Sequence, residues 1–180
     1  MKRMAFGLTI EAIEKQTKTV TRRPAETWGT LKSGDRLVAV DKVMGLKKGQ
    51  SPRILGVIRV TDVRVESLLA ITPEDCIREG FPDKTPAEFM KVYVDAYGLS
   101  LNDARFFEVR RIEFEYLAGD ALIAAMGEID ARAKATRKAR ERKAIKGWQA
   151  EVLSKAGLTT VHSEVHEMPH APLPNEAVLP

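Results

Sequence analysis

Residues 18–23 read Lys-Thr-Val-Thr-Arg-Arg, and Pro24 follows them directly. The threonines and the valine favour a β-strand, and the proline marks its end because proline cannot donate a hydrogen bond to a neighbouring strand. A short helical segment precedes the run, so Lys18 and Thr21 can converge where a helix passes into a strand. Backbone groups at such a junction are also free to bind a ligand. The run is the densest polar group in the predicted core, and it places a candidate site at a helix-to-strand junction.

The segments on either side of this run follow ordinary local rules. Residues 8–16 predict a short helix with Ile10 and Ile13 on one face. Residues 31–35 predict a turn, and residues 36–40 (Arg-Leu-Val-Ala-Val) predict a strand that is mostly buried. A helix, a strand, a turn and a second strand therefore surround the candidate site.

The middle of the chain predicts a long strand. A polar loop at residues 45–52 leads to residues 54–65, where apolar residues alternate around a short continuous apolar run. Gly56 lies inside this strand and predicts a bulge or a bend. A bend there is typical of a strongly curved sheet.

Two helices and a closing strand complete the predicted core. Thr72-Pro73 and Thr85-Pro86 each place an N-cap threonine before a proline at the first helical position, and Gly98 is suited to end the second helix. Residues 106–117 then return to alternation. This order predicts an α+β fold, a small mixed β-barrel with flanking helices, rather than a parallel doubly wound sheet.

The composition changes after residue 117. Residues 121–155 are rich in Ala, Glu, Lys and Arg and predict one long helix or two, with Gly127 and Gly147 as weak points. The last residues are rich in Pro, His and Glu and predict a disordered tail. The predicted domains are therefore a barrel at residues 1–117, a basic helical extension at 118–157 and a disordered tail at 158–180.

Positive charge is concentrated in the helical extension. The whole chain carries a formal net charge of +4, whereas residues 131–148 alone hold eight basic residues and one acid, Glu141. This excess predicts a polyanion-binding element, although a solvated helix or a surface for self-association would have the same composition. The candidate nucleic-acid contacts are Arg132, Lys134, Arg137, Lys138, Arg140, Arg142 and Lys143.

The polar run also suggests a reaction. A lysine whose pKa is lowered by burial can act as a base toward a neighbouring hydroxyl, here Lys18 toward Thr21. Arg23 offers a planar guanidinium for a phosphate, a carboxylate or an aromatic ring. Glu79, at the end of the first inserted helix, is the best candidate for an acidic partner. Lys, Thr and Arg near a strand start are also commonly solvated or paired with nearby acids, so the residues alone leave catalysis open.

At this point the sequence resembles the ASCH domains, which are PUA-like β-barrels. Their opening pattern is Gly-x-Lys-x-x-Thr-x-Arg; this chain has Lys18, Thr21 and Arg23 in register and Gln16 in place of the glycine. The resemblance covers about residues 1–117. It continues through Gly34-Asp35, the strand Gly56-Val57-Ile58-Arg59-Val60, the helix end Glu79-Gly80-Phe81 and the strand Ile112-Glu113-Phe114.

The resemblance implies a cleft for RNA or a modified nucleoside. Some small bacterial ASCH proteins similar to this chain remove the acetyl group of N(4)-acetylcytidine with a lysine, a threonine and a glutamate, which correspond here to Lys18, Thr21 and Glu79. Thr21 would attack the amide carbonyl, Lys18 would accept its proton, and Glu79 would handle the leaving amine or orient the base. Arg23 would position the substrate. Other members of the family are ribonucleases or RNA-binding modules.

Two hypotheses follow. The first is an amidohydrolase acting on an acylated pyrimidine nucleoside without a cofactor. The second is a non-catalytic RNA-binding module, or a ribonuclease, that uses the cleft together with the basic helix. The chain shows neither a signal peptide nor an apolar run long enough for a membrane span, so a cytoplasmic protein is expected.

The remaining reactive residues are assigned minor roles. Cys76, the single cysteine, is predicted to be a packing residue, and it excludes an internal disulfide. His162, His166 and His170 are spaced by four in the polar tail, where a metal site is not predicted because Pro169 interrupts any helix. Because the core lacks histidine, a ribonuclease with a histidine pair is disfavoured.

Overall fold

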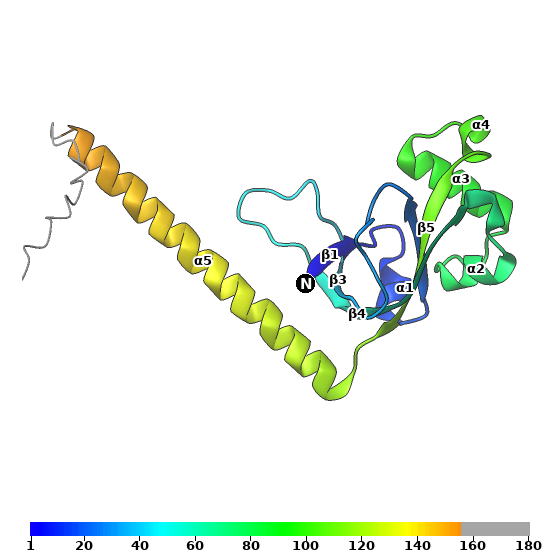
Figure 1. Ribbon diagram of the computed structural model, residues 1–180, viewed down its shortest axis with the longest axis horizontal. Coiled ribbons are helices and arrows are strands. Elements are labelled where there is room, and N and C mark those ends of the chain that lie inside the picture. Colours follow the sequence, from blue (N-terminus) through cyan, green and yellow to red (C-terminus); the bar gives the residue numbers. More distant parts are fainter. Residues whose placement is uncertain (156–180) are drawn as a thin grey trace, which may run out of the picture. The chain divides into compact units, whose positions relative to one another are not determined.

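Five strands pair into one curled sheet in the order β1-β3-β4-β5-β2 (Figure 1). The computed structural model describes residues 1–155. Its elements are β1 (Lys2–Ala5), α1 (Ile10–Glu14), β2 (Val20–Pro24), β3 (Arg36–Val40), β4 (Ile54–Ser67), the 3₁₀ turn η1 (Leu68–Ala70), α2 (Pro73–Arg78), α3 (Pro86–Tyr97), α4 (Leu101–Ala104), β5 (Glu108–Tyr116) and α5 (Gly119–Lys155). The α+β class predicted from the sequence is confirmed.

The sheet curls into a half-barrel, which agrees with the β-barrel-like architecture predicted from the sequence. β1 and β2 stand at its two edges, and β1 pairs in parallel with β3 whereas every other neighbouring pair is antiparallel. β4 makes the curvature possible, because its register shifts once against β3 and once against β5. The first of these shifts lies beside Gly56, where the sequence predicts a bulge or a bend.

Two hydrophobic clusters form the core. The first fills the inside of the curved sheet and contains Met4, Phe6, Ile13, Leu31, Leu37, Ala39, Ile58, Val60, Ile112 and Phe114. The second lies under α2, α3 and α4 and contains Leu68, Ile71, Cys76, Phe89, Tyr93, Val94, Ala104 and Val109. Cys76 is therefore a buried packing residue, as predicted, and burial raises the pKa of its thiol.

The N-terminal caps of α2 and α3 follow the sequence closely. The hydroxyl of Thr72 accepts a hydrogen bond from the Asp75 N–H, and Thr85 forms a complete capping box with Glu88. α3 ends at Gly98, whose φ of 65° lies in the left-handed region that favours glycine. These starts and stops were predictable because each depends on a few adjacent residues.

The chain divides into two compact units, Met1–Arg132 and Ala133–Pro180. α5 begins in the first unit, where Ala125 is buried and Glu128 pairs with Arg36 at 3.0 Å. It is one continuous helix through Gly127 and Gly147, so neither glycine interrupts it. None of the helices in residues 1–155 has the length and apolar character needed to cross a membrane. The three tail histidines and the predicted disordered tail lie outside the described residues, and the predicted domain boundaries stay predictions.

Gly80 fixes the distance between α1 and the end of α2. Its φ is 85°, and a Cβ placed on it would lie 2.8 Å from the Cβ of Ala12 and 3.3 Å from Cγ2 of Thr9.

We expect Gly80→Ala to lower the free energy of unfolding by about 2–5 kcal/mol, from backbone strain and overpacking together. Gly98→Ala is the matched control. A Cβ there meets nothing within 4 Å, so only the strain of about 1–2 kcal/mol remains. Urea unfolding measures both, and equal losses would show that the contact with α1 has no energetic weight.

Candidate functional site

A cavity of about 510 Å³ lies where the two hydrophobic clusters meet. Met4 and Phe6 of the first cluster line it on one side, and Phe89 and Tyr93 of the second cluster line it on another. All four of the residues predicted for a reaction in this region, Lys18, Thr21, Arg23 and Glu79, also line the cavity. A concave, largely apolar pocket with a few polar groups is the usual form of a small-molecule site.

Residues 17–19 are held by three neighbouring elements. The N–H of Lys18 donates to the Ala12 carbonyl of α1 at 3.2 Å, and the N–H of Thr19 donates to the Arg78 carbonyl of α2 at 2.9 Å. The Tyr116 hydroxyl of β5 donates to the Lys18 carbonyl at 2.7 Å. The backbone of the polar run is therefore fixed before β2 begins.

Glu79 is the C-terminal cap of α2. The Gly80 N–H donates to the Ile77 carbonyl and the Phe81 N–H donates to the Cys76 carbonyl, each at 2.9 Å. This pair of bonds forms a Schellman motif, with Gly80 as the left-handed residue. The turn directs the Glu79 side chain toward the polar run rather than toward solvent.

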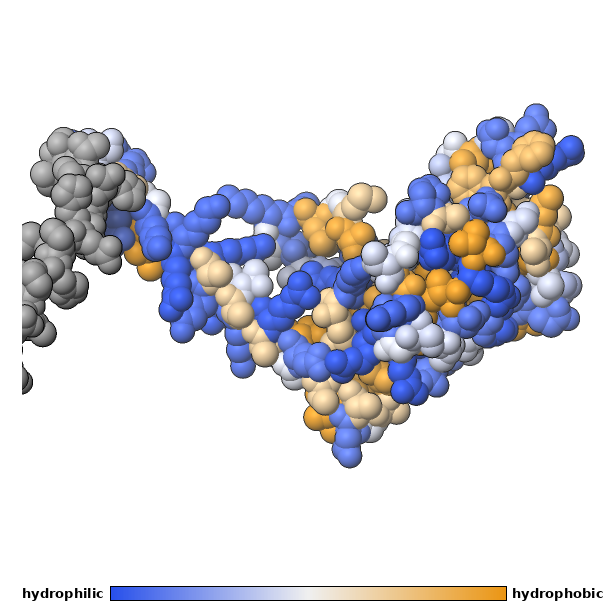
Figure 2. All heavy atoms as spheres, in the orientation of Figure 1, coloured by the Kyte–Doolittle hydropathy of each residue, from blue (hydrophilic) through white to orange (hydrophobic). Residues whose placement is uncertain are grey.

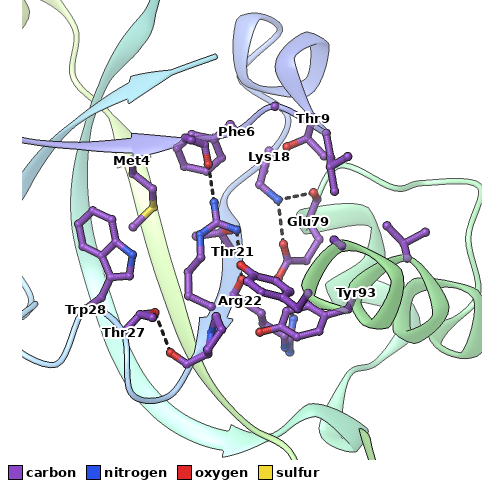
Figure 3. Close-up of a pocket in the computed structure, with 18 of the residues that line it drawn as sticks. Met4, Phe6, Thr9, Lys18, Thr21, Arg22, Thr27, Trp28, Glu79 and Tyr93 are labelled. Atoms are coloured by element: carbon purple, nitrogen blue, oxygen red, sulfur yellow. Dashed lines mark hydrogen bonds and ion pairs between the residues drawn. The ribbon is translucent and has the colours of Figure 1, made fainter. Parts of the chain in front are cut away.

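Lys18 and Glu79 form a buried ion pair (Figure 3). The Lys18 ammonium donates to Oε2 of Glu79 at 2.8 Å and also to the Glu79 backbone carbonyl, and each side chain is 3% exposed. The same ammonium lies 6.0 Å from the ring centroids of Phe6 and Phe81. The structure thus brings together two residues that stand 61 positions apart in the chain.

Burial lowers the pKa of Lys18. The carboxylate of Glu79 acts in the opposite direction, whereas the charges of Arg23 and Arg22 lower the pKa further. Burial has the largest effect because an ammonium loses its hydration in such a position. A lysine whose pKa is lowered releases its proton more readily, which is the property required of a general base.

Arg22 joins the ion pair to a larger network that the sequence did not reveal. It donates to Oε1 of Glu79 at 3.2 Å, to Glu66 of β4 at 2.7 Å and to Asp75 of α2. Its side chain is fully buried, and although burial opposes its charge, these carboxylates raise its pKa. Both carboxylate oxygens of Glu79 therefore accept hydrogen bonds from cations, one from Lys18 and one from Arg22.

Thr21 and Arg23 differ from these residues in their partners. The Thr21 side chain is buried on the cavity wall, and its hydroxyl has no hydrogen-bond partner within residues 1–155. Arg23 donates to the Ala5 carbonyl at 2.6 Å and stacks over Phe6 at 5.5 Å, but no carboxylate in the described part of the chain pairs with it. A hydroxyl and a cation are thus both available to a ligand.

Tyr93 provides a further polar group in the cavity wall. Its hydroxyl is buried and has no hydrogen-bond partner among the described residues. Burial raises its pKa, so the hydroxyl stays protonated and can donate. The sequence gives no other sign of this role than a tyrosine hydroxyl in a predicted helix of the core.

The basic residues of α5 form no pocket of this kind. In residues 133–155 the side chains are exposed on all sides of the helix, and Figure 2 shows hydrophilic residues along most of its visible side. Arg137 pairs with Glu141 at 3.5 Å, the one acid of the basic stretch. Arg132, which the sequence placed in the same group, donates to the Met1 carbonyl at 3.3 Å. The helix presents charge without an apolar face in residues 133–144.

Comparison with known proteins gives distant structural neighbours. No protein-family model matches the chain, and no curated protein matches it significantly. An ASCH domain from Lactobacillus crispatus JV V101 is similar with a TM-score of 0.49 and 13% identity, over 64% of this chain and 78% of that one. A DUF984 protein from Enterococcus faecalis V583 has a TM-score of 0.44 and 17% identity, over 64% and 79%. A hypothetical protein has a TM-score of 0.46 and 24% identity, over 65% of this chain and all of its own. These similarities are too low to indicate the chemistry of the pocket, which is therefore derived from the residues that line it.

The ion pairs of Glu113 of β5 with Arg111 and Arg78 predict that the protein loses stability in acid. Burial opposes ionisation of Glu113, but its bonds with Arg111 and Arg78 outweigh burial and lower its pKa to about 2, from an ordinary 4.5. The carboxylate therefore contributes stability above about pH 4.5, and this contribution is lost as the pH falls toward 2. We expect the free energy of unfolding to decrease across this window, and to decrease less steeply in Glu113→Gln. Glu115→Gln, which changes a half-exposed carboxylate two residues along β5, is the control. Parallel pH profiles for wild type and Glu113→Gln would contradict this role.

Proposed function

We propose that the cavity binds an acylated pyrimidine nucleoside and hydrolyses its amide, with N(4)-acetylcytidine as the first substrate to test. The observation that carries the proposal is the buried Lys18 ammonium, held by Glu79 and lining the same cavity as the unpartnered Thr21 hydroxyl. Lysine is almost never fully buried unless it is paired, as Lys18 is with Glu79, and perturbed lysines in clefts are candidates for functional sites. The resemblance of residues 16–23 to the ASCH opening supports the same reading.

The proposed hydrolysis needs only Lys18, Thr21 and a water molecule, and no cofactor. Neutral Lys18 accepts the proton of the Thr21 hydroxyl while the threonine oxygen attacks the amide carbonyl, which forms a tetrahedral intermediate. Its C–N bond then breaks, and the leaving amine takes a proton from the Lys18 ammonium. A water molecule, deprotonated by Lys18, hydrolyses the threonine ester, and Lys18 returns its proton to Thr21. The products are cytidine and acetic acid, which releases its proton to the solvent and becomes acetate.

The contacts of Glu79 favour an orienting role over a role as the acid. Both of its carboxylate oxygens already accept hydrogen bonds, one from Lys18 and one from Arg22, so neither oxygen is free to contact the leaving amine. Glu79 then fixes the direction of the Lys18 amine. Arg23, which lacks a carboxylate partner among residues 1–155, positions the substrate through its guanidinium.

Substitution of Thr21 tests the reaction most directly. Thr21→Val keeps the shape of the side chain and removes the nucleophile, so we expect kcat for N(4)-acetylcytidine to fall by at least about 100-fold. Thr19→Val is the matched control, because Thr19 lies two residues away and its hydroxyl accepts a hydrogen bond from Arg78. Release of cytidine and acetate is measured by chromatography. Lys18→Met should abolish the same activity, and wild-type kcat should rise with pH to a midpoint below 10.5, the ordinary pKa of lysine. A Thr21→Val variant with full activity would rule out the threonine nucleophile.

A second candidate function has its own observation in its favour. The cationic side chains of residues 133–146 are exposed around the whole helix, and such an arrangement suits a polyanion that surrounds the helix on more than one side. In this alternative the chain is an RNA-binding module, and Lys18 and Arg23 hold phosphate or base in the cavity without a reaction.

Salt dependence tests this second function. Five Lys or Arg to Gln changes in α5 should reduce the slope of log affinity against log salt by about 0.7 for each phosphate of single-stranded RNA that the variant no longer neutralises. The control variant carries the same reduction of charge at exposed lysines of the first unit. An equal effect of both variants would mean that net charge, and not α5, governs binding. The α5 positions are Lys134, Lys138, Arg140, Arg142 and Lys143, and the control positions are Lys15, Lys32, Lys47, Lys48 and Lys91.

A further inference from the structure

Trp28 has a backbone conformation that a tryptophan rarely adopts. It lies in the loop between β2 and β3, and its φ is 59°. This left-handed region is costly for a residue with a Cβ and is normally occupied by glycine, asparagine or aspartate. Within residues 1–155 only Gln16 shares this feature among the residues other than glycine.

The surrounding loop holds Trp28 in this conformation. Arg110 of β5 donates to the Thr27 carbonyl at 3.1 Å and to the Ala25 carbonyl at 2.9 Å, while the Leu31 N–H donates to the Trp28 carbonyl at 2.9 Å. An arginine of the sheet thus fixes the loop from one side and a backbone bond closes it on the other. Strain that the neighbouring structure enforces in this way is characteristic of functional positions.

The indole of Trp28 lines the cavity. The ring packs against the first hydrophobic cluster and remains partly exposed. In the view of Figure 3, Trp28 and Met4 lie on one side of the pocket, while Lys18, Glu79 and Tyr93 lie on the other. Asparagine or glycine would adopt this backbone conformation with less strain, whereas this chain has a large aromatic side chain here that lines the cavity.

We propose that Trp28 is the platform on which the flat ring of the ligand stacks, and that it determines specificity for a heteroaromatic base. The inference rests on the proposed function for the identity of that base, a pyrimidine. Stacking on an aromatic side chain uses the π-face that every base has, and it leaves the edges of the base to polar groups. Arg23 and the unpartnered hydroxyl of Tyr93 are available in the same cavity for those edges.

The chain provides a direct optical test, because it contains two tryptophans and the other is Trp148 of α5. In the variant Trp148→Phe, Trp28 is the sole tryptophan. We expect cytidine, which is a product and is not consumed, to quench its fluorescence in a saturable way, whereas ribose should not. In Trp28→Phe, where Trp148 alone reports, cytidine should produce no saturable change. Absence of quenching in Trp148→Phe would overturn the stacking role.

Two substitutions separate the ring from the backbone strain. Trp28→Asn and Trp28→Ala both remove the indole, but asparagine tolerates a left-handed backbone better than alanine. We expect the Asn variant to unfold at a higher temperature than the Ala variant, and both to bind cytidine about 5- to 100-fold more weakly than wild type, as measured by calorimetry. A residue needed only for packing would lose stability in both variants without changing the affinity of the folded protein. Unchanged affinity in both would therefore overturn the proposal.

Failure of this inference is distinguishable from failure of the proposed reaction. Saturable quenching by cytidine without any hydrolysis of N(4)-acetylcytidine would leave the stacking platform in place and remove the reaction. Hydrolysis that proceeds with unchanged kcat/KM in both Trp28 variants would retain the reaction and remove the platform. If cytidine caused no quenching and N(4)-acetylcytidine were not hydrolysed, both proposals would be overturned.

Discussion

The rest of the first unit depends on the ion pairs that the buried guanidinium of Arg22 makes. It ties together β2, which carries it, β4 through Glu66, and α2 through Asp75 and Glu79. Arg22 also lies directly across from Arg111 of β5, and Arg111 lies across from Arg64 of β4. Like charges at paired positions repel, so this row of arginines is stable only because carboxylates stand between them. Removing one partner from such a buried group costs about 3–5 kcal/mol, which makes the network a strong constraint on where α2 can sit.

The position of α2 in turn determines the cavity. Because Asp75 is bound by Arg22 and by Arg111, the helix is anchored over one end of the sheet, and its C-terminal turn at Gly80 lies against α1. The second hydrophobic cluster forms under α2, α3 and α4, beside the first cluster inside the curved sheet, and the two do not merge. The space left where they meet is the cavity. Lys18, Arg22 and Glu79, which belong to the charge network, line it. One electrostatic constraint therefore produces both the fold of the helical region and the polar wall of the pocket.

The parts of this structure that sequence reasoning predicted are those fixed by neighbouring residues. Strand Arg36–Val40 and the two proline-initiated helices follow from local patterns, and their bounds agree closely with the structure. β1 escaped prediction because it has four residues and its pairing with β3 is long-range and parallel. Glu79 was a candidate partner for Lys18 that the family resemblance then supported, but no local rule brings together residues 61 positions apart. Arg22 and Trp28 were missed for the same reason: the partners of one come from distant elements, and the torsion of the other is set by Arg110 on another strand.

The two proposed functions make different demands on the ionisation of Lys18. A lysine that serves only to hold phosphate gains from a pKa that stays high, and a full ion pair with one carboxylate would keep it high. Here the carboxylate of Glu79 binds two cations, Lys18 through one oxygen and Arg22 through the other. Burial and the charges of Arg23 and Arg22 act against the ammonium as well, and together they lower the pKa of Lys18. The arrangement holds Lys18 firmly in place while easing the release of its proton. The proposed reaction requires this combination of Lys18, whereas the binding alternative requires only its position.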